Sequence, residues 1–349
     1  MSRTALVAGA TGATAKRLVE VLLGSDWNVV GVSRNPPAGA GRLTYRTANL
    51  LDADKTAHTL ADCRSVTHVF YTGRAQFAEG GVESVDDNVA MLRNTLDAIE
   101  PVAADLAHIH LVQGGKYYGQ HLGPFPTPAR ENDPRHMPPN FYYDQQDLLV
   151  ERQRGRRWSW SASRPDFVCD FAPERARNII SVLGAYAAIA RELDVPFDFP
   201  GRSGCFDAVK QATDGSQLAQ AMAFIATTPA CANSVFNVTN GDVFRWSRLW
   251  PQLADFFGLL QGQTRSMKLA DWMADKEPVW QRIVEKHGLK RQKLSEIANW
   301  QFADFQWSQD YDVISNVNRL REAGFNGLVD SEQMFLTHLA RYRATKIFP

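Results

Sequence analysis

The chain has 349 residues, 44% of them hydrophobic, so it can bury a substantial core and fill about two globular units or one enlarged domain. Lysine plus arginine and aspartate plus glutamate are equal at 38 each, and no basic run with interleaved aromatic residues stands out. The charge balance therefore gives no reason to expect a nucleic acid or a membrane surface as a partner.

The first strand pattern and the cysteines favour a cytoplasmic protein. The apolar stretch TALVAGATG begins at residue 4, without the basic and long apolar regions of a secretory signal. The most apolar later stretch, VLGAYAAIA, is far shorter than the roughly 20 residues of a membrane span. The four cysteines lie far apart and form no Cys-x-x-Cys pair, which suits a reducing compartment.

Alternating strand and helix patterns in the first half predict a parallel sheet. Apolar strand patterns at 5–9, 27–33, 67–73 and 108–115 alternate with helical patterns at 13–25 and 85–102. Nearly continuous apolar strands joined by helices are typical of a sheet covered on both faces. The fold class is therefore α/β, with a Rossmann-type doubly wound parallel sheet that binds ligands at the carboxyl ends of its strands.

The pattern loosens beyond about residue 165. Turns rich in proline and glycine, such as FDFPGRSG at 197–204, alternate with aromatic helical patterns such as that at 269–288. We expect residues 1–165 to form the domain that contains this sheet and binds its main ligand. Residues 166–349 should form mainly a smaller substrate-binding cap, partly interleaved with that domain.

A glycine motif after the first strand predicts a dinucleotide site. Gly9, Gly12 and Ala15 form a Gly-x-x-Gly-x-x-Ala arrangement between a strand and a helix. Gly9 permits the tight turn, Gly12 lets backbone N–H groups approach a pyrophosphate, and Ala15 keeps the helix close to the strand.

The end of the second strand favours NADP over NAD. An NAD site places a carboxylate there for the ribose 2′-hydroxyl, whereas an NADP site places a cation for the 2′-phosphate. The sequence has Ser33 and Arg34 at this point, and a guanidinium can bind a phosphate through two hydrogen bonds. Asn49 and Leu50 follow where this fold usually covers the adenine.

The lysine that a catalytic tyrosine needs is not at the usual place. Reductases of this fold commonly carry tyrosine and lysine four residues apart on one helix, where the ammonium lowers the tyrosine pKa. Only Tyr342 has a lysine at that spacing, Lys346, and it lies outside the alternating half of the chain. We interpret that match as a coincidence.

Tyr142 is better placed. The segment PPNFYYDQQD predicts a helix start, with Asn140 as N-cap and Asp144 in the first turn, where a negative charge is favoured. The preceding strand–loop unit, HIHLVQGGKYYG, carries Lys116 just past a carboxyl strand end. We therefore expect Lys116, from this neighbouring loop, to provide the positive charge that a lysine four residues after the tyrosine provides in the common arrangement.

Four segments carry a resemblance to a known family: GGKYYG with the following GPF, NFYYDQQD, FPG at 199–201, and FNVTNGDVFRW at 236–246. They resemble the progesterone 5β-reductase/iridoid synthase-like enzymes, an atypical group of extended short-chain dehydrogenases/reductases, over nearly the whole chain. The resemblance implies NADPH-dependent 1,4-reduction of enones or enals, with a homodimer as a possible assembly. It places the motif tyrosine at Tyr142 and the motif lysine at Lys116.

The resemblance also implies a set of cofactor contacts. In this sequence they fall on Thr11, Gly12, Ala13, Ser33, Arg34, Asn49, Leu50, Gly73, Arg74, Gln113 and Val168. Three positions depart from the family pattern: Gln146 stands for a usual Glu, Arg74 for a Trp common in plant members, and Ser163 for a usual His. The loop between Lys116 and Phe125 is also longer. These departures leave the substrate open, and a steroid does not follow from the resemblance.

The remaining candidates have a packing alternative beside the functional one. Phe125, after the Lys116 loop, is a candidate wall of the substrate pocket. Trp246 could line that pocket with Trp250, four residues on, although a core stripe is the more ordinary interpretation. His108 and His110 should lie on one face of a strand, and without a third ligand nearby we expect ordinary sheet histidines and no metal.

Two other functions compete with 1,4-reduction. A 1,2-carbonyl reductase or a sugar-nucleotide epimerase would normally use the Tyr-x-x-x-Lys pair. A non-catalytic NADP-sensing protein would typically have lost the active tyrosine and lysine, both of which this chain keeps. The sequence therefore favours an NADPH-dependent enone or enal reductase.

Overall fold

The structure, a computed structural model, describes residues 3–77, 82–290 and 293–349. The chain forms two compact units. The first unit comprises Met1–Asp166, Gly215–Val238 and Asn316–Gly327, and the second comprises Phe167–Asp214, Thr239–Ser315 and Leu328–Pro349. Two later segments of the chain thus complete the first unit.

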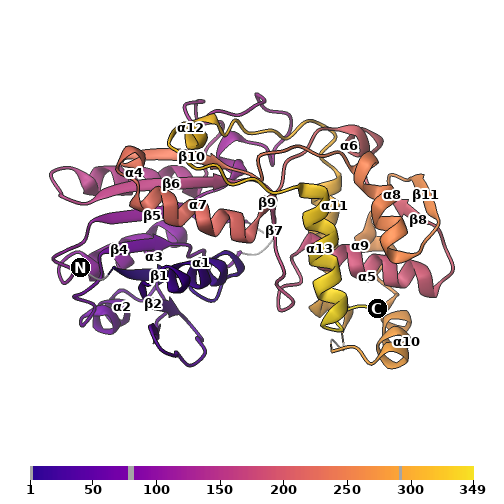
Figure 1. The fold of residues 1–349 in the computed structure, drawn as a ribbon, viewed down its shortest axis with the longest axis horizontal. Coiled ribbons are helices and arrows are strands. Elements are labelled where there is room, and N and C mark those ends of the chain that lie inside the picture. The colour runs from indigo at the N-terminus through magenta and orange to yellow at the C-terminus, as the bar shows by residue number, and fades with distance from the viewer. Residues whose placement is uncertain (1–2, 78–81, 291–292) are drawn as a thin grey trace. The chain divides into compact units, whose positions relative to one another are not determined.

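A seven-stranded sheet forms the centre of the first unit (Figure 1). All its neighbouring strands pair in parallel. This confirms the Rossmann-type fold class. The strand order is β10 (Ser234–Val238), β6 (Ser159–Pro165), β5 (His108–Val112), β4 (His68–Tyr71), β1 (Thr4–Ala8), β2 (Asn28–Ser33) and β3 (Leu43–Thr47).

Helices cover both faces of this sheet. On one face, a hydrophobic cluster joins α1 (Ala13–Gly24) and α7 (Gly215–Thr227) to strand side chains such as Val7 and Phe70. On the other face, a second cluster joins α2 (Ala53–Leu60), α3 (Val85–Ile99) and α4 (Phe141–Gln153) to the neighbouring strand residues, such as Leu6 and Tyr71. Shorter helical turns complete the unit: η2 (Gly115–Tyr118), η3 (Pro229–Cys231) and α12 (Asn318–Glu322).

A ladder of histidines and serines joins β5 to β6 within the sheet. His108 contacts Ser159 and Ser161 through its two ring nitrogens at 2.8 and 2.7 Å, and His110 contacts Ser161 and Ser163 at 2.8 and 3.1 Å. Both imidazoles therefore lie on one face, as predicted, and act as hydrogen-bonding groups of the sheet. Among the described residues, no group of three or more potential metal ligands occurs.

The second unit is built around an aromatic core. Helix α5 (Ile179–Glu192) is buried along its length from Ile179 to Ala190, and Trp250, Trp280 and Trp307 pack into the same cluster. The other helices are α6 (Ser203–Asp207), α8 (Trp246–Phe257), α9 (Leu269–Trp272), α10 (Glu277–His287), η4 (Leu294–Glu296), α11 (Trp300–Trp307) and α13 (Ser331–Ala344).

Two short parallel strand pairs also belong to the second unit. They are β7 (Val168–Cys169) with β9 (Thr213–Asp214), and β8 (Phe197–Phe199) with β11 (Gln261–Thr264). In the described part of the chain, no helix has both the length and the apolar character that crossing a bilayer requires.

The structure differs from the sequence prediction at one long helix. The pattern at 269–288 forms two helices, α9 and α10, rather than one. Pro278 lies in the first turn of α10, where its missing N–H costs nothing, and a proline there marks a helix start rather than a helix interior.

We predict that the buried histidines make the protein sensitive to mild acid. Burial lowers the pKa of His68 to about 4 and that of His108 to about 3, and it holds that of His110 well below its usual value. The unfolded chain binds these protons near pH 6.5, whereas the folded chain stays neutral. Stability should fall from pH 7 to pH 5 by about 2 kcal/mol per histidine, measured by urea unfolding.

The variant His68→Gln should make this loss smaller. His58→Gln, which removes an exposed histidine, is the matched control. An equal urea midpoint at pH 7 and pH 5 for the unsubstituted protein would contradict the prediction.

Candidate active site

The glycine turn between β1 and α1 is tightly packed. Gly9 has φ +79°, and a Cβ at this position would lie 3.0 Å from the Cα and the N of Gly73. The N–H groups of Gly9 and Ala10 donate to the carbonyl of Val32 at 2.9 and 3.0 Å. The turn therefore lies against the ends of β2 and β4, and a residue larger than glycine would push it away from Gly73.

The amino end of α1 is suited to an anion. Gly12 is the N-cap, with no side chain capping the helix and no acidic residue in the first turn, which begins at Ala13. Unsatisfied N–H groups and the positive end of the helix dipole together favour a phosphate at such an end. Thr11, Gly12 and Ala13, all partly exposed, would be the residues nearest to it.

The carboxyl ends of β2 and β3 carry the residues expected to select the nucleotide. The hydroxyl of Ser33 is buried and has no hydrogen-bond partner among the described residues. Arg34 and Asn49 are exposed, whereas Leu50 is buried. An unpaired hydroxyl beside an exposed guanidinium fits a polar, anionic ligand group, because each can still donate a hydrogen bond.

Asn140 positions Tyr142 next to the Lys116 loop. Its Oδ1 accepts a hydrogen bond from the Tyr142 N–H at 3.1 Å, as an N-cap does, while its Nδ2 donates to the Lys116 carbonyl at 2.9 Å. The Tyr142 hydroxyl reaches the same loop, because a Cβ on Gly114 would lie 3.3 Å from it. The structure thus brings Tyr142 and the backbone of Lys116 together at the carboxyl end of β5.

The side chain of Lys116 is held by a residue that sequence reasoning missed. Its Nζ lies 2.9 Å from Oε2 of Glu83, and Oε1 of Glu83 is paired with the guanidinium of Arg74. Glu83 directly precedes Ser84, the N-cap of α3, at the carboxyl side of β4. The sequence offered one indication of Glu83: an acidic residue at the start of a helix that follows a strand. A favourable interaction with the helix dipole would have explained that acidic residue equally well.

Arg74 is the cation whose charge acts on Tyr142. Burial raises the pKa of the Tyr142 phenol, and the positive charge of Arg74 opposes that rise. The guanidinium carbon of Arg74 lies 5.8 Å from the ring centre of Phe141 and 4.8 Å from that of Phe77. The rings of Phe141 and Tyr142 are 4.4 Å apart. Arg74, expected only as a cofactor contact, therefore also belongs to the surroundings of Tyr142.

Gln113 links Tyr142 to a buried arginine. Its Nε2 donates to the Tyr142 carbonyl at 3.0 Å, and its Oε1 accepts from Nε of Arg164 at 2.8 Å. Oε1 of Gln146 accepts from Arg164 at 3.1 Å. Arg164 is 1% exposed, and its guanidinium lies over the ring of Tyr117 at 3.3 Å. Gln146, at the position of a usual Glu, therefore gives this buried cation a neutral acceptor.

The aromatic residues around Tyr142 form a separate small core. Tyr143 is buried, and its hydroxyl donates to the carbonyl of Tyr117 at 2.7 Å, so it packs in this core and its hydroxyl is already bound. Phe125 is partly buried and packs against the cluster that contains Tyr117, Tyr142 and Tyr143. A side chain at this position lies in the same cluster as the phenol, which is compatible with the pocket-wall role predicted for Phe125.

Two predicted site residues belong to the second unit. Trp246 is only 2% exposed and packs against Phe244, Trp307 and Phe335, so the structure favours the core-stripe interpretation over an open pocket wall. Its large indole ring removes more apolar surface from water there than it would at a pocket rim. Val168, in β7, is 38% exposed.

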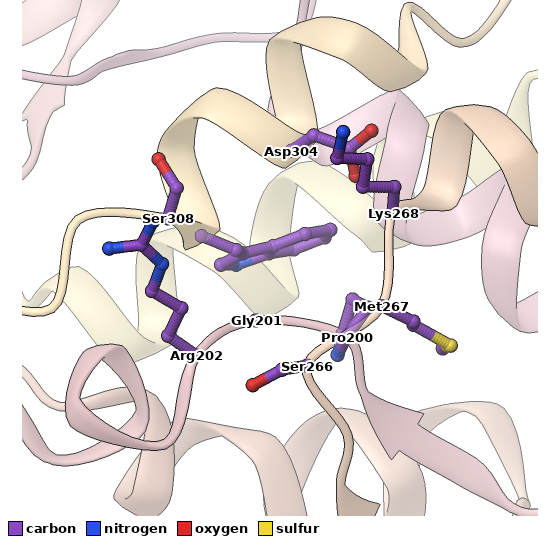
Figure 2. Close-up of a pocket in the computed structure, with 9 residues that line it drawn as sticks. Pro200, Gly201, Arg202, Ser266, Met267, Lys268, Asp304 and Ser308 are labelled. Carbon is purple, nitrogen blue, oxygen red and sulfur yellow. The ribbon is translucent and has the colours of Figure 1, made fainter.

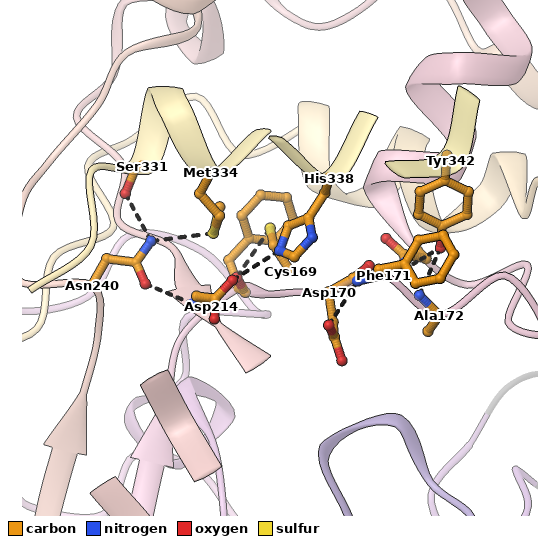
Figure 3. A network of polar contacts seen from close by, with 12 residues as sticks. Cys169, Asp170, Phe171, Ala172, Asp214, Asn240, Ser331, Met334, His338 and Tyr342 are labelled. Carbon is orange, nitrogen blue, oxygen red and sulfur yellow. Dashed lines mark hydrogen bonds and ion pairs between the residues drawn. The ribbon is translucent and has the colours of Figure 1, made fainter. Parts of the chain in front are cut away.

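Tyr342 has a structural role, although a lysine follows it four residues on. It is fully buried, and its hydroxyl accepts hydrogen bonds from the N–H of Ala172 at 2.9 Å and from Nδ2 of Asn178 at 3.0 Å (Figure 3). Its neighbour in the same network, His338, contacts Asp214 at 2.8 Å. The coincidence assigned to Tyr342 and Lys346 agrees with these contacts.

The second unit contains a cavity beside the FPG segment (Figure 2). It has a volume of about 240 Å³. A Cβ on Gly201 would lie 2.6 Å from the Phe199 ring and 2.7 Å from the Trp307 carbonyl, so the wall needs glycine here. The lining residues are Pro200, Gly201, Arg202, Ser266, Met267, Lys268, Asp304, Trp307 and Ser308.

Solved structures share this fold. A UDP-glucose 4-epimerase from Thermotoga maritima superimposes with a TM-score of 0.70 at 14% identity, covering 98% of this chain and 99% of that one. A short-chain dehydrogenase/reductase superfamily protein from Agrobacterium tumefaciens, solved with bound NAD, gives 0.69 at 16% identity, covering 99% and 98%. At these identities the likeness concerns the fold alone.

Sequence comparison identifies the family. A family model described as a PRISE-like Rossmann-fold domain matches residues 37–349. An (S)-8-oxocitronellyl enol synthase of Nepeta racemosa and a 3-oxo-Δ(4,5)-steroid 5-beta-reductase of Arabidopsis thaliana are each 34% identical, covering 99% of this chain and 93% of theirs. A short chain dehydrogenase of Penicillium aethiopicum is 31% identical over the full length of both chains. The chain therefore belongs to the PRISE-like Rossmann-fold family, the progesterone 5β-reductase/iridoid synthase-like oxidoreductases of the short-chain dehydrogenase/reductase superfamily.

Proposed function

We propose that the protein reduces the carbon–carbon double bond of enones or enals with NADPH, and that Tyr142 stabilises the enolate. The observation that carries the proposal is the buried phenol of Tyr142 at the carboxyl end of β5. Asn140 binds the backbone N–H of Tyr142, and the cationic residues Lys116 and Arg74 lie on adjoining segments. A hydrogen-bond donor in such a site can stabilise an oxygen on which negative charge develops.

The names of the relatives support the choice of substrate class. One relative is a reductase of steroids whose double bond is conjugated with a 3-oxo group, and another forms an enol of an oxocitronellyl compound. Conjugation of a double bond with a carbonyl group is common to the reductase's substrate and to the proposed class.

NADPH, when bound, supplies the hydride that is added to the β-carbon of the substrate. The residues of the chain act on the other end of the conjugated system. The Tyr142 hydroxyl donates a hydrogen bond to the carbonyl oxygen and keeps its proton as negative charge builds up there. Because burial raises the pKa of this phenol, it stays protonated at neutral pH and remains a donor.

The nearby cations improve this donor. A positive charge close to a phenol lowers its pKa and makes its proton a stronger hydrogen-bond donor. Arg74 provides such a charge. The charge of Lys116, whose backbone lies beside Tyr142, is proposed to add to it. The carbon atom next to the carbonyl group can then take its proton from water, so no further acid is required.

Arg34 supports the choice of NADPH over NADH. It is exposed at the end of β2, directly after the unpaired hydroxyl of Ser33, and no carboxylate occupies either position. A guanidinium binds a phosphate through two hydrogen bonds, whereas the ribose 2′-hydroxyl of NADH would offer it no charge.

We predict that Tyr142→Phe lowers kcat for a small enone by about 10²–10³-fold while NADPH binds as before. The reason is the loss of one hydrogen-bond donor at the transition state. Turnover is followed by NADPH absorbance, and the product is identified by mass spectrometry. Tyr143→Phe is the matched control, because it removes the neighbouring hydroxyl, which is bound to Tyr117, and should keep turnover within a few-fold.

Unchanged turnover in Tyr142→Phe would remove Tyr142 from the mechanism. An allylic alcohol as product would mean 1,2-reduction instead. NADPH binding without turnover over a panel of small enones and enals would support a sensing protein.

A second prediction concerns the nucleotide. Arg34→Ser should raise the Kd of NADPH by about 10–100-fold, because a charge-assisted phosphate contact contributes roughly 1.5–3 kcal/mol. The Kd of NADH should stay the same, and both are measured by fluorescence titration. Arg64→Ser, at an exposed arginine outside the predicted site, serves as control. An equal effect on both nucleotides would contradict the role of Arg34.

A further inference from the structure

We propose that Glu83 is a positioning residue of this site: its single carboxylate holds the cations of Lys116 and Arg74 together, so that both act on the Tyr142 hydroxyl. The inference rests on the proposed function, since it concerns how the tyrosine is made a better donor. It gives this chain an arrangement in which an arginine assists the loop lysine in the role that the i+4 lysine has in the common reductases.

The geometry divides the carboxylate between the two cations. Oε2 of Glu83 is 2.9 Å from Nζ of Lys116, and Oε1 is paired with the guanidinium of Arg74. The three residues come from three segments: Arg74 from the loop after β4, Glu83 from the residue before the α3 N-cap, and Lys116 from η2 after β5. One acidic residue therefore connects the ends of two neighbouring strands.

Partial burial of Glu83 and Lys116 should make their ion pair stronger than an ordinary surface pair, whereas Arg74 is more exposed. The Glu83 side chain is 19% exposed, that of Lys116 26%, and that of Arg74 38%. Exposed ion pairs contribute little because water screens them, whereas partly buried charges are screened less. Glu83 also fixes where the two cations lie. Lysine and arginine have long, flexible side chains whose charged ends would otherwise extend toward water.

Glu83 has two opposite effects on Tyr142, and their difference makes the proposal testable. Its negative charge alone would raise the phenol pKa. By holding Lys116 beside Arg74, the cation that acts on the phenol, it would lower that pKa. The cluster carries two positive charges and one negative charge, so the cations prevail as long as they stay in place. Lys116 also acts on His121, whose pKa is lowered to about 4 by burial and by the charge of Lys116, so that His121 is neutral at pH 7.

The test measures the pKa of the residue at position 142 in the protein without turnover. Tyr142 is replaced by 3-fluorotyrosine, and its ionisation is followed by ¹⁹F NMR. In the Glu83→Gln background the phenol pKa should rise by roughly half a unit to one unit, because the released cations move away. Arg74→Gln should raise it in the same direction. The double variant should raise it less than the sum of the two single changes.

Asp86→Asn is the matched control, since it removes one negative charge three residues away at an exposed position of α3 and should leave the phenol pKa unchanged. Glu83→Asp, which keeps the charge, should restore part of the effect. In turnover of a small enone, Glu83→Gln should lower kcat by about tenfold. A melting temperature near that of the unsubstituted protein verifies folding.

A fall in the phenol pKa in Glu83→Gln would mean that the cations stay in place without Glu83, and it would overturn the proposal. An unchanged pKa would overturn it as well. The titration is independent of substrate, so failure of the unsubstituted protein to reduce any enone would count against the proposed function and not against the arrangement of the charges.

Discussion

The two hydrogen bonds of the Asn140 side chain hold the candidate site together. Its Oδ1 caps α4 at the N–H of Tyr142, and its Nδ2 binds the carbonyl of Lys116. A local helix cap thereby fixes the relation between two segments that come from different parts of the chain. Because the cap and the loop share one side chain, the tyrosine can be presented at the end of β5 without a lysine on its own helix.

The surroundings of Tyr142 combine burial with positive charge. Burial keeps the phenol protonated, since it disfavours the phenolate, and the cations counteract part of this effect. Arg164, which is buried and donates to the neutral side chains of Gln113 and Gln146, adds another positive charge to this part of the first unit. The aromatic ring of Tyr117 stabilises the Arg164 guanidinium without neutralising its charge, and the ring of Phe141 lies beside the guanidinium of Arg74.

Much of the first unit could be predicted from sequence because its signals are local. Four apolar strands, the glycine turn at Gly9 and the N-cap at Asn140 each depend on residues next to one another. Strand β3 and helix α2 were missed, since LTYRT lies at the sheet edge with little apolar content and ADKTAHTL has few apolar residues. Glu83 was missed because its partners lie 9 and 33 positions away. Trp246 shows a limit of spacing: the aromatic spacing was compatible with a pocket wall and with a core stripe, and only the burial of the ring favours the core.

The central claim is that the protein adds hydride to the β-carbon of a conjugated carbonyl compound while Tyr142 binds its oxygen. The most direct measurement uses NADPH with deuterium at C4 of the nicotinamide and a small enone, with the position of the label read by NMR. The account predicts deuterium on the β-carbon of a saturated ketone. Deuterium on the carbinol carbon of an allylic alcohol would contradict it.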